Sequence, residues 1–117
     1  MAQTPNDLVS AAKADVPDIS AADAVALHTQ SGVVFLDVRE PAEVAGGKVA
    51  GAVAIPRGVL EFQTEALAGA ETVVVYCAAG GRAALAGATL KAMGFKDVRN
   101  AGGFKDWVEA GGAVEVG

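Results

Sequence analysis

Nearly continuous apolar runs alternate with segments of helical spacing along this chain. The runs at residues 33–36, 52–55 and 72–76 are typical of strands that are buried on both faces of a sheet. Residues 97–99 are predicted to add a short edge strand. Because strands alternate with helices, we predict an α/β fold with a central, largely parallel sheet flanked by helices.

Capping residues and helical spacing indicate where the helices lie. Ser20 fits the start of a helix that stops before Gly32, and a helix over residues 82–93 is expected to end at Gly94. Near the start of the chain, residues 5–14 are predicted to form a short amphipathic helix. These helices would flank the predicted sheet.

A last short helix is expected near the end of the chain. Phe104, Trp107 and Val108 would share one of its faces, and the two aromatic rings are interpreted as core anchors. Gly102 and Gly103 are predicted to form the turn that leads into this helix.

The chain is expected to contain one domain. It has 117 residues, of which 52% are hydrophobic, and this is enough apolar surface to bury one core. Residues 1–15 are predicted to be an N-terminal extension that includes the short helix, and residues 16–117 are predicted to be the domain itself.

Charge and composition argue against several kinds of function. The net charge of −5 and the isoelectric point near 4.7 disfavour nucleic-acid and membrane partners. Neither a membrane-spanning run nor a secretory signal is evident, so we expect a cytoplasmic location. With one cysteine and one histidine, the chain can form neither an internal disulfide nor a zinc cluster. We therefore expect chemistry that uses a single thiol.

The candidate site is the junction between the apolar run at 72–76 and the helix that follows it. It contains a thiol, four small residues and a cation: Cys77, Ala78, Ala79, Gly80, Gly81 and Arg82. The two glycines permit the backbone angles at which successive N–H groups turn inward around an anion. The helix N-terminus adds the positive end of its dipole, so we expect a thiolate at neutral pH. An inert buried cysteine would not need such a loop.

Four charged residues near this junction have candidate roles. Asp37 and Arg39 follow a strand at the sheet edge where α/β proteins bind ligands, and we favour a supporting role in which they hold the loop through hydrogen bonds. Glu43 lies in the first turn of a helix and is expected to complement its dipole. Arg82 is expected to recognise a dianionic donor, or else to pair with a carboxylate such as Asp37.

From about residue 19 to residue 116, the chain resembles the rhodanese-like family. The matching segments, in order, are residues 36–43, residues 47–56, the loop 77–82 and residues 102–107. The resemblance implies a rhodanese-like domain in which Cys77 takes a sulfane sulfur from a small anionic donor such as thiosulfate. The resulting persulfide passes the sulfur to cyanide or to a thiol acceptor, which can be a protein thiol. No metal or organic cofactor is implied.

The chain departs from the family pattern at three positions. Lys48 stands where histidine is common, Ala50 where proline is common, and Ala83 where serine is common. None of them is the nucleophile, but each could change loop packing or access to the site. We therefore expect these positions to affect the choice of substrate rather than the reaction class.

Two alternative functions fit parts of the same pattern. Cysteine-dependent phosphatases carry a Cys-x5-Arg motif, with five residues between cysteine and arginine. In this chain only four residues separate Cys77 from Arg82. An arsenate reductase usually needs further cysteines to resolve its intermediate, and this chain has none. A non-catalytic interaction module with the same fold is the second alternative, because fold alone does not establish activity. The retained cysteine argues against this module.

Overall fold

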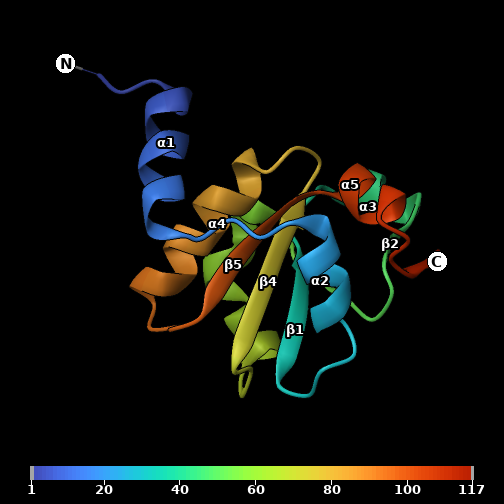
Figure 1. The fold of residues 1–117 in the computed structure, drawn as a ribbon. Helices are drawn as coiled ribbons and strands as arrows, with labels where there is room; N and C mark the ends of the chain where they lie inside the picture. Colours follow the sequence, from blue (N-terminus) through green and yellow to red (C-terminus); the bar gives the residue numbers. More distant parts are fainter. Residues whose placement is uncertain (1, 117) are drawn as a thin grey trace.

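The computed structural model describes residues 2–116. It contains a four-stranded parallel sheet, of which β1, β4 and β5 are labelled in Figure 1. Its strands lie in the order β3-β1-β4-β5, and each neighbouring pair runs parallel. They are β1 (Val33–Asp37), β3 (Val53–Ala54), β4 (Thr72–Cys77) and β5 (Val98–Gly103). This arrangement confirms the predicted α/β fold with a central parallel sheet.

Helices cover both faces of this sheet, with α1 and α4 on one side and α2 on the other (Figure 1). The α-helices are α1 (Pro5–Asp15), α2 (Ala21–Leu27), α3 (Pro41–Ala45), α4 (Gly81–Ala92) and α5 (Phe104–Glu109). Two 3₁₀ helices, η1 (Arg57–Phe62) and η2 (Thr64–Leu67), connect β3 to β4. None of the helices within residues 2–116 has the length and apolarity that a membrane crossing requires.

Side chains of β4 alternate between two cores, because successive residues of a strand point to opposite faces. Val73, Val75 and Cys77 belong to the core beneath α4 and α1. Val74 and Tyr76 belong to the core on the other face, which also holds side chains of α2 and α5. The alternation therefore directs the thiol toward α4, the helix that begins four residues later.

The N-terminal helix packs against α4. Val16, which follows α1 directly, is fully buried in the core beneath α4. A Cβ atom at Gly87 would lie 2.9 Å from the Val16 methyl groups, so the glycine allows this close approach. The Lys91 ammonium also donates a hydrogen bond of 2.9 Å to the Asp15 carbonyl. Residues of the N-terminal segment thus help to hold the helix that starts at the candidate loop.

Two predictions for the end of the chain are wrong. Val108 is 48% exposed, because it follows the buried Trp107 by one position and therefore points about 100° away around α5. Gly102 and Gly103 belong to β5, which continues far enough for Gly103 to pair with Cys77 after an irregularity in the register.

The structure contains a second, small sheet that the sequence did not predict. β2 (Lys48–Val49) and β6 (Val114–Glu115) form a separate antiparallel pair, which joins the segment after α3 to the end of the chain. The helix predicted from Ser20 ends at Leu27, and His28 occupies its C-terminal cap.

Candidate functional site

Cys77 is the last residue of β4, at the carboxyl edge of the parallel sheet where α/β proteins place their ligands. The residue is buried, with an exposed fraction of 1%. Its Sγ accepts hydrogen bonds from the Gly80 N–H at 2.9 Å and the Ala83 N–H at 3.4 Å. Two backbone donors at a helix N-terminus stabilise negative charge on this sulfur.

The loop takes its shape from Gly80, which has a φ of +99° and precedes the first residue of α4. Only glycine adopts this left-handed conformation without steric cost, so the glycine allows a sharp change of direction from strand to helix. The backbone of residues 78–82 was predicted to surround the sulfur, and of these residues Gly80 donates to Sγ. The second donor is the N–H of Ala83, one residue further along, in the first turn of α4.

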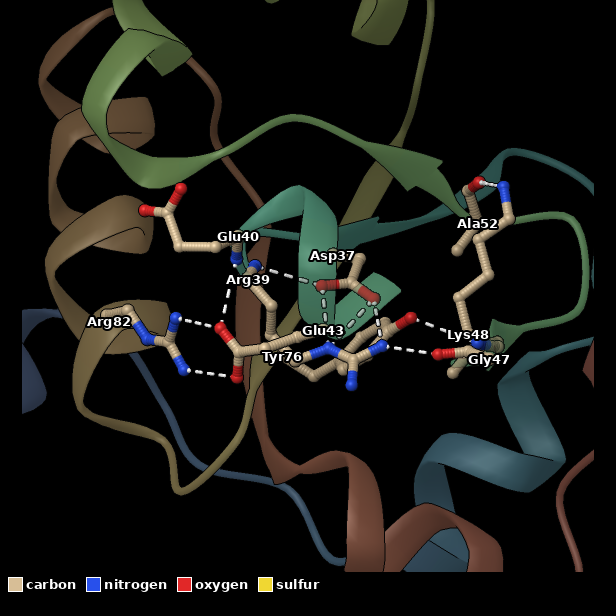
Figure 2. A network of polar contacts seen from close by, with 10 residues as sticks. Asp37, Arg39, Glu40, Glu43, Gly47, Lys48, Ala52, Tyr76 and Arg82 are labelled. Carbon is tan, nitrogen blue, oxygen red and sulfur yellow. Dashed lines mark hydrogen bonds and ion pairs between the residues drawn. The ribbon is translucent and has the colours of Figure 1, made fainter. Parts of the chain in front are cut away.

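Arg82 forms a two-pronged ion pair with Glu43 of α3 (Figure 2), with Nη1 to Oε1 at 2.7 Å and Nη2 to Oε2 at 3.0 Å. The Glu43 carboxylate also accepts a hydrogen bond from the Glu40 N–H at 3.1 Å. The hydrogen bond from Arg82 lowers the pKa of Glu43 to about 2, and the same bond raises the pKa of Arg82. Arg82 thus pairs with a carboxylate, which was one of its expected roles, but the carboxylate is that of Glu43 and not that of Asp37.

Asp37 is already engaged by Arg39, and both side chains are buried. The Arg39 guanidinium donates to the Asp37 carboxylate at 2.8 to 3.1 Å and to the Gly47 carbonyl at 2.6 Å (Figure 2). It lies 4.4 Å from the centre of the Phe104 ring. Burial opposes the charge on Arg39, but the hydrogen bond and charge of Asp37 outweigh it and raise its pKa. These contacts hold together the segments after β1 and before β2.

Tyr76 directly precedes the thiol but serves the opposite face of the sheet. Its hydroxyl accepts a hydrogen bond of 3.0 Å from the Val49 N–H. Burial raises the pKa of Tyr76, and the nearby carboxylate of Asp37 adds to this shift. Because the side chains alternate along β4, the phenol is directed away from the side of the sheet that holds Sγ.

Gly103 allows β5 to approach the candidate loop. A Cβ atom at this position would collide with the carbonyl oxygen of Ala78. The local sequence predicts only a turn at this glycine, because the pairing of β5 with β4 that brings it beside the loop joins segments far apart in the chain.

The three departures from the family pattern have structural explanations. The Lys48 ammonium donates to the Ala52 carbonyl at 2.7 Å and so closes the turn between β2 and β3. The Ala50 N–H donates to the Ala113 carbonyl at 3.0 Å, a hydrogen bond that proline could not form. Ala83 is fully buried in the core that also holds Cys77, a position that suits an apolar side chain.

A cavity of about 560 Å³ borders the loop at Ala79 and Gly80. Its charged lining residues are Lys13, Asp18, Asp106 and Glu109. The Cys77 side chain is not part of this lining but lies in the core beneath α4. The loop therefore has a buried side that holds the sulfur and another side that faces the cavity.

Acid should weaken the contact between α3 and α4. Because the pKa of Glu43 is lower in the folded protein than its ordinary value of 4.5, its ion pair stabilises the fold above pH 4.5. This contribution is lost as the pH falls through the folded value of about 2. Both side chains are about one-third exposed, so we expect Glu43→Gln to cost about 1 kcal/mol or less at pH 7.

Urea unfolding of wild type and Glu43→Gln at several pH values measures this contribution. The difference in stability should shrink between pH 4.5 and pH 2. Glu109→Gln, which breaks a far more exposed ion pair with Lys105, serves as the control. A difference between wild type and Glu43→Gln that does not change with pH would contradict the assignment.

Fold and site together define an α/β domain in which a buried cysteine at the end of β4 accepts two backbone hydrogen bonds at the start of α4. Residues 20–110 match the family model of the rhodanese-like domain, and the chain belongs to this family. The resemblance seen in the sequence is thereby confirmed.

Relatives with known sequences or structures agree with this membership. A sulfurtransferase of Allochromatium vinosum is 32% identical over 80 residues, which are 68% of this chain and 75% of that protein. A polysulfide-sulfur transferase homodimer from Wolinella succinogenes has a TM-score of 0.77 at 37% identity, covering 93% of this chain and 85% of that one.

Another solved structure belongs to a protein of unknown function from Rhodopseudomonas palustris that is described as a possible tyrosine phosphatase. Its TM-score is 0.88 at 34% identity, over 98% of this chain and 96% of that one. Two related proteins of Bacillus subtilis are longer, and this chain spans 40% and 64% of their lengths. The shared fold and family thus do not by themselves identify the reaction.

Proposed function

We propose that this protein is a sulfurtransferase in which Cys77 carries a sulfane sulfur as a persulfide. The observation that carries this proposal is the pair of backbone N–H groups directed at Sγ at the start of α4. Donors in this position stabilise a thiolate, and the thiolate is the nucleophilic form of cysteine. The sulfurtransferases among the relatives support the same class of reaction.

The reaction is a double displacement. The Cys77 thiolate attacks the outer sulfur of thiosulfate, the sulfur–sulfur bond of the donor breaks, and sulfite leaves with the electron pair. Cyanide, or a thiolate acceptor, then attacks the outer sulfur of the persulfide. The bond to Sγ breaks, and Cys77 leaves as the thiolate from which the cycle began. With cyanide as acceptor, neither step requires a proton.

This mechanism needs no general base, and the surroundings of Cys77 are consistent with that. His28 lies on the opposite face of the sheet, where its ring contacts Phe35 and Trp107. In our proposal the backbone from Ala78 to Arg82 surrounds the transferred sulfur, and its N–H groups favour an anionic donor. The ion pair with Glu43 would orient Arg82 and keep the first turn of α4 in place.

Phosphate-ester hydrolysis is the alternative suggested by the description of the Rhodopseudomonas protein. The length of the loop disfavours it here. Four residues separate Cys77 from Arg82, so the loop is shorter than the Cys-x5-Arg loop of such phosphatases. A smaller loop suits a terminal sulfur atom better than a phosphoryl group.

Parallel assays separate these functions. Wild-type protein should form thiocyanate from thiosulfate and cyanide, and should hydrolyse p-nitrophenyl phosphate no faster than Cys77→Ser. Cysteine-dependent release of p-nitrophenol would instead favour a phosphatase. If neither thiocyanate nor a persulfide forms, the remaining candidate is a non-catalytic interaction module.

A further inference from the structure

Asn100 of β5 is a buried polar residue whose side chain reaches the candidate loop. It is 2% exposed, and its Nδ2 donates to the Gly80 carbonyl at 3.1 Å. Its Oδ1 accepts from the Gly102 N–H at 2.8 Å. A buried amide is costly unless its hydrogen bonds are formed, so these contacts hold the amide in one orientation.

The backbone of Asn100 is fixed as well. Its N–H donates to the Pro17 carbonyl at 2.8 Å, and its carbonyl accepts from the Ile19 N–H at 2.9 Å. These two hydrogen bonds form an isolated parallel β-bridge between Asp18 and Asn100, so residues 17–19 lie along the outer edge of β5. The amide that reaches Gly80 is therefore supported from two sides.

Gly80 connects this amide to the thiol. Its N–H lies 2.9 Å from Sγ, and its carbonyl accepts from both Asn100 and the Ala84 N–H. Glycine is the residue with the greatest backbone freedom, so its orientation must be maintained by its partners. The bond from Ala84 comes from α4 itself, whereas the bond from Asn100 fixes Gly80 relative to the sheet that holds Cys77.

We infer that Asn100 is a positioning residue for Cys77: its amide holds Gly80 so that the Gly80 N–H remains directed at Sγ. Loss of this bond lets Gly80 rotate, which weakens the donor that stabilises the thiolate. The inference deepens the proposed function, on which its catalytic meaning rests. A purely structural role would require only the bond between Asn100 and Gly102, which shapes the end of β5.

Two substitutions separate these roles. Asn100→Ala removes both side-chain bonds. Asn100→Ser keeps a neutral oxygen that can accept from the Gly102 N–H but is too short to reach Gly80. Thr72→Val is the matched control, because it removes a hydrogen bond of 2.8 Å to Asp97 at the opposite end of the same two strands.

The readouts are the ultraviolet absorbance of the thiolate and the rate of alkylation by iodoacetamide, both at neutral pH. Melting temperatures are measured beside them. Asn100→Ala and Asn100→Ser should both reduce the thiolate absorbance and slow alkylation about 10-fold, as expected for weakening a hydrogen bond to a charged group. Thr72→Val should react with iodoacetamide like wild type, even if its melting temperature falls as much as those of the Asn100 variants.

Three results would overturn the inference: wild-type reactivity in both Asn100 variants, wild-type reactivity in Asn100→Ser alone, or equal slowing in Thr72→Val. Neither readout uses a sulfur donor. A wild-type protein that fails to form a persulfide would therefore contradict the proposed function without affecting the test of Asn100.

Discussion

Replacement of Arg39 by alanine is expected to lower the free energy of unfolding by about 3 to 5 kcal/mol, because it removes one partner of a buried ion pair. The Asp37 carboxylate would remain in a fully buried position with a single backbone donor, the N–H of residue 39. The Gly47 carbonyl and the Phe104 ring would also lose their contacts with the guanidinium.

Urea unfolding measures this effect, and Arg99→Ala is the matched control. Arg99 also pairs with an aspartate two positions away, but both side chains of that pair are more than one-third exposed. Exposed pairs contribute about 1 kcal/mol or less. If Arg39→Ala costs no more than Arg99→Ala, the interpretation of Asp37 and Arg39 as a buried pair that holds the segments after β1 and before β2 is wrong.

Substitution of Cys77 by serine should abolish thiocyanate formation, with a loss of at least about 1,000-fold, as for other enzymes that lose their nucleophile. The serine hydroxyl remains protonated at neutral pH and cannot form a persulfide. The exchange changes the side-chain volume little, so the fold should persist.

Thiocyanate rates and melting temperatures of wild type, Cys77→Ser and Arg99→Ala test this prediction together. Arg99→Ala should retain activity, because the Arg99 side chain pairs with Asp97, near the start of β5. Residual activity in Cys77→Ser close to that of wild type would assign the reaction to another group.

The sheet and the position of the thiol could be predicted because they follow from local patterns. Apolar runs that alternate with capped helices define a parallel α/β sheet. A cysteine between a strand and a Gly-Gly-Arg segment must then lie at the edge where helix N-termini gather. The pair of Asp37 and Arg39 could likewise be interpreted as structural from its place at the end of β1.

Contacts between distant segments could not be predicted in the same way. Arg82 has several carboxylates within reach on the basis of sequence alone, and only the packing of α3 beside α4 selects Glu43. In the sequence, Asn100 cannot be distinguished from any other polar residue of an edge strand. Only the register between β4 and β5 shows that its side chain lies beside Gly80. The sequence around Glu43 and around Asn100 therefore contains no motif that indicates the role of either residue.

The persulfide itself is tested most directly by the intact mass of the protein. Wild-type protein is incubated with thiosulfate in the absence of reductant, freed of excess reagent and weighed by mass spectrometry. The mechanism predicts the addition of one sulfur atom, its removal by dithiothreitol or cyanide, and no addition to Cys77→Ser. An unchanged wild-type mass, or an adduct that persists in Cys77→Ser, would contradict sulfur transfer through Cys77.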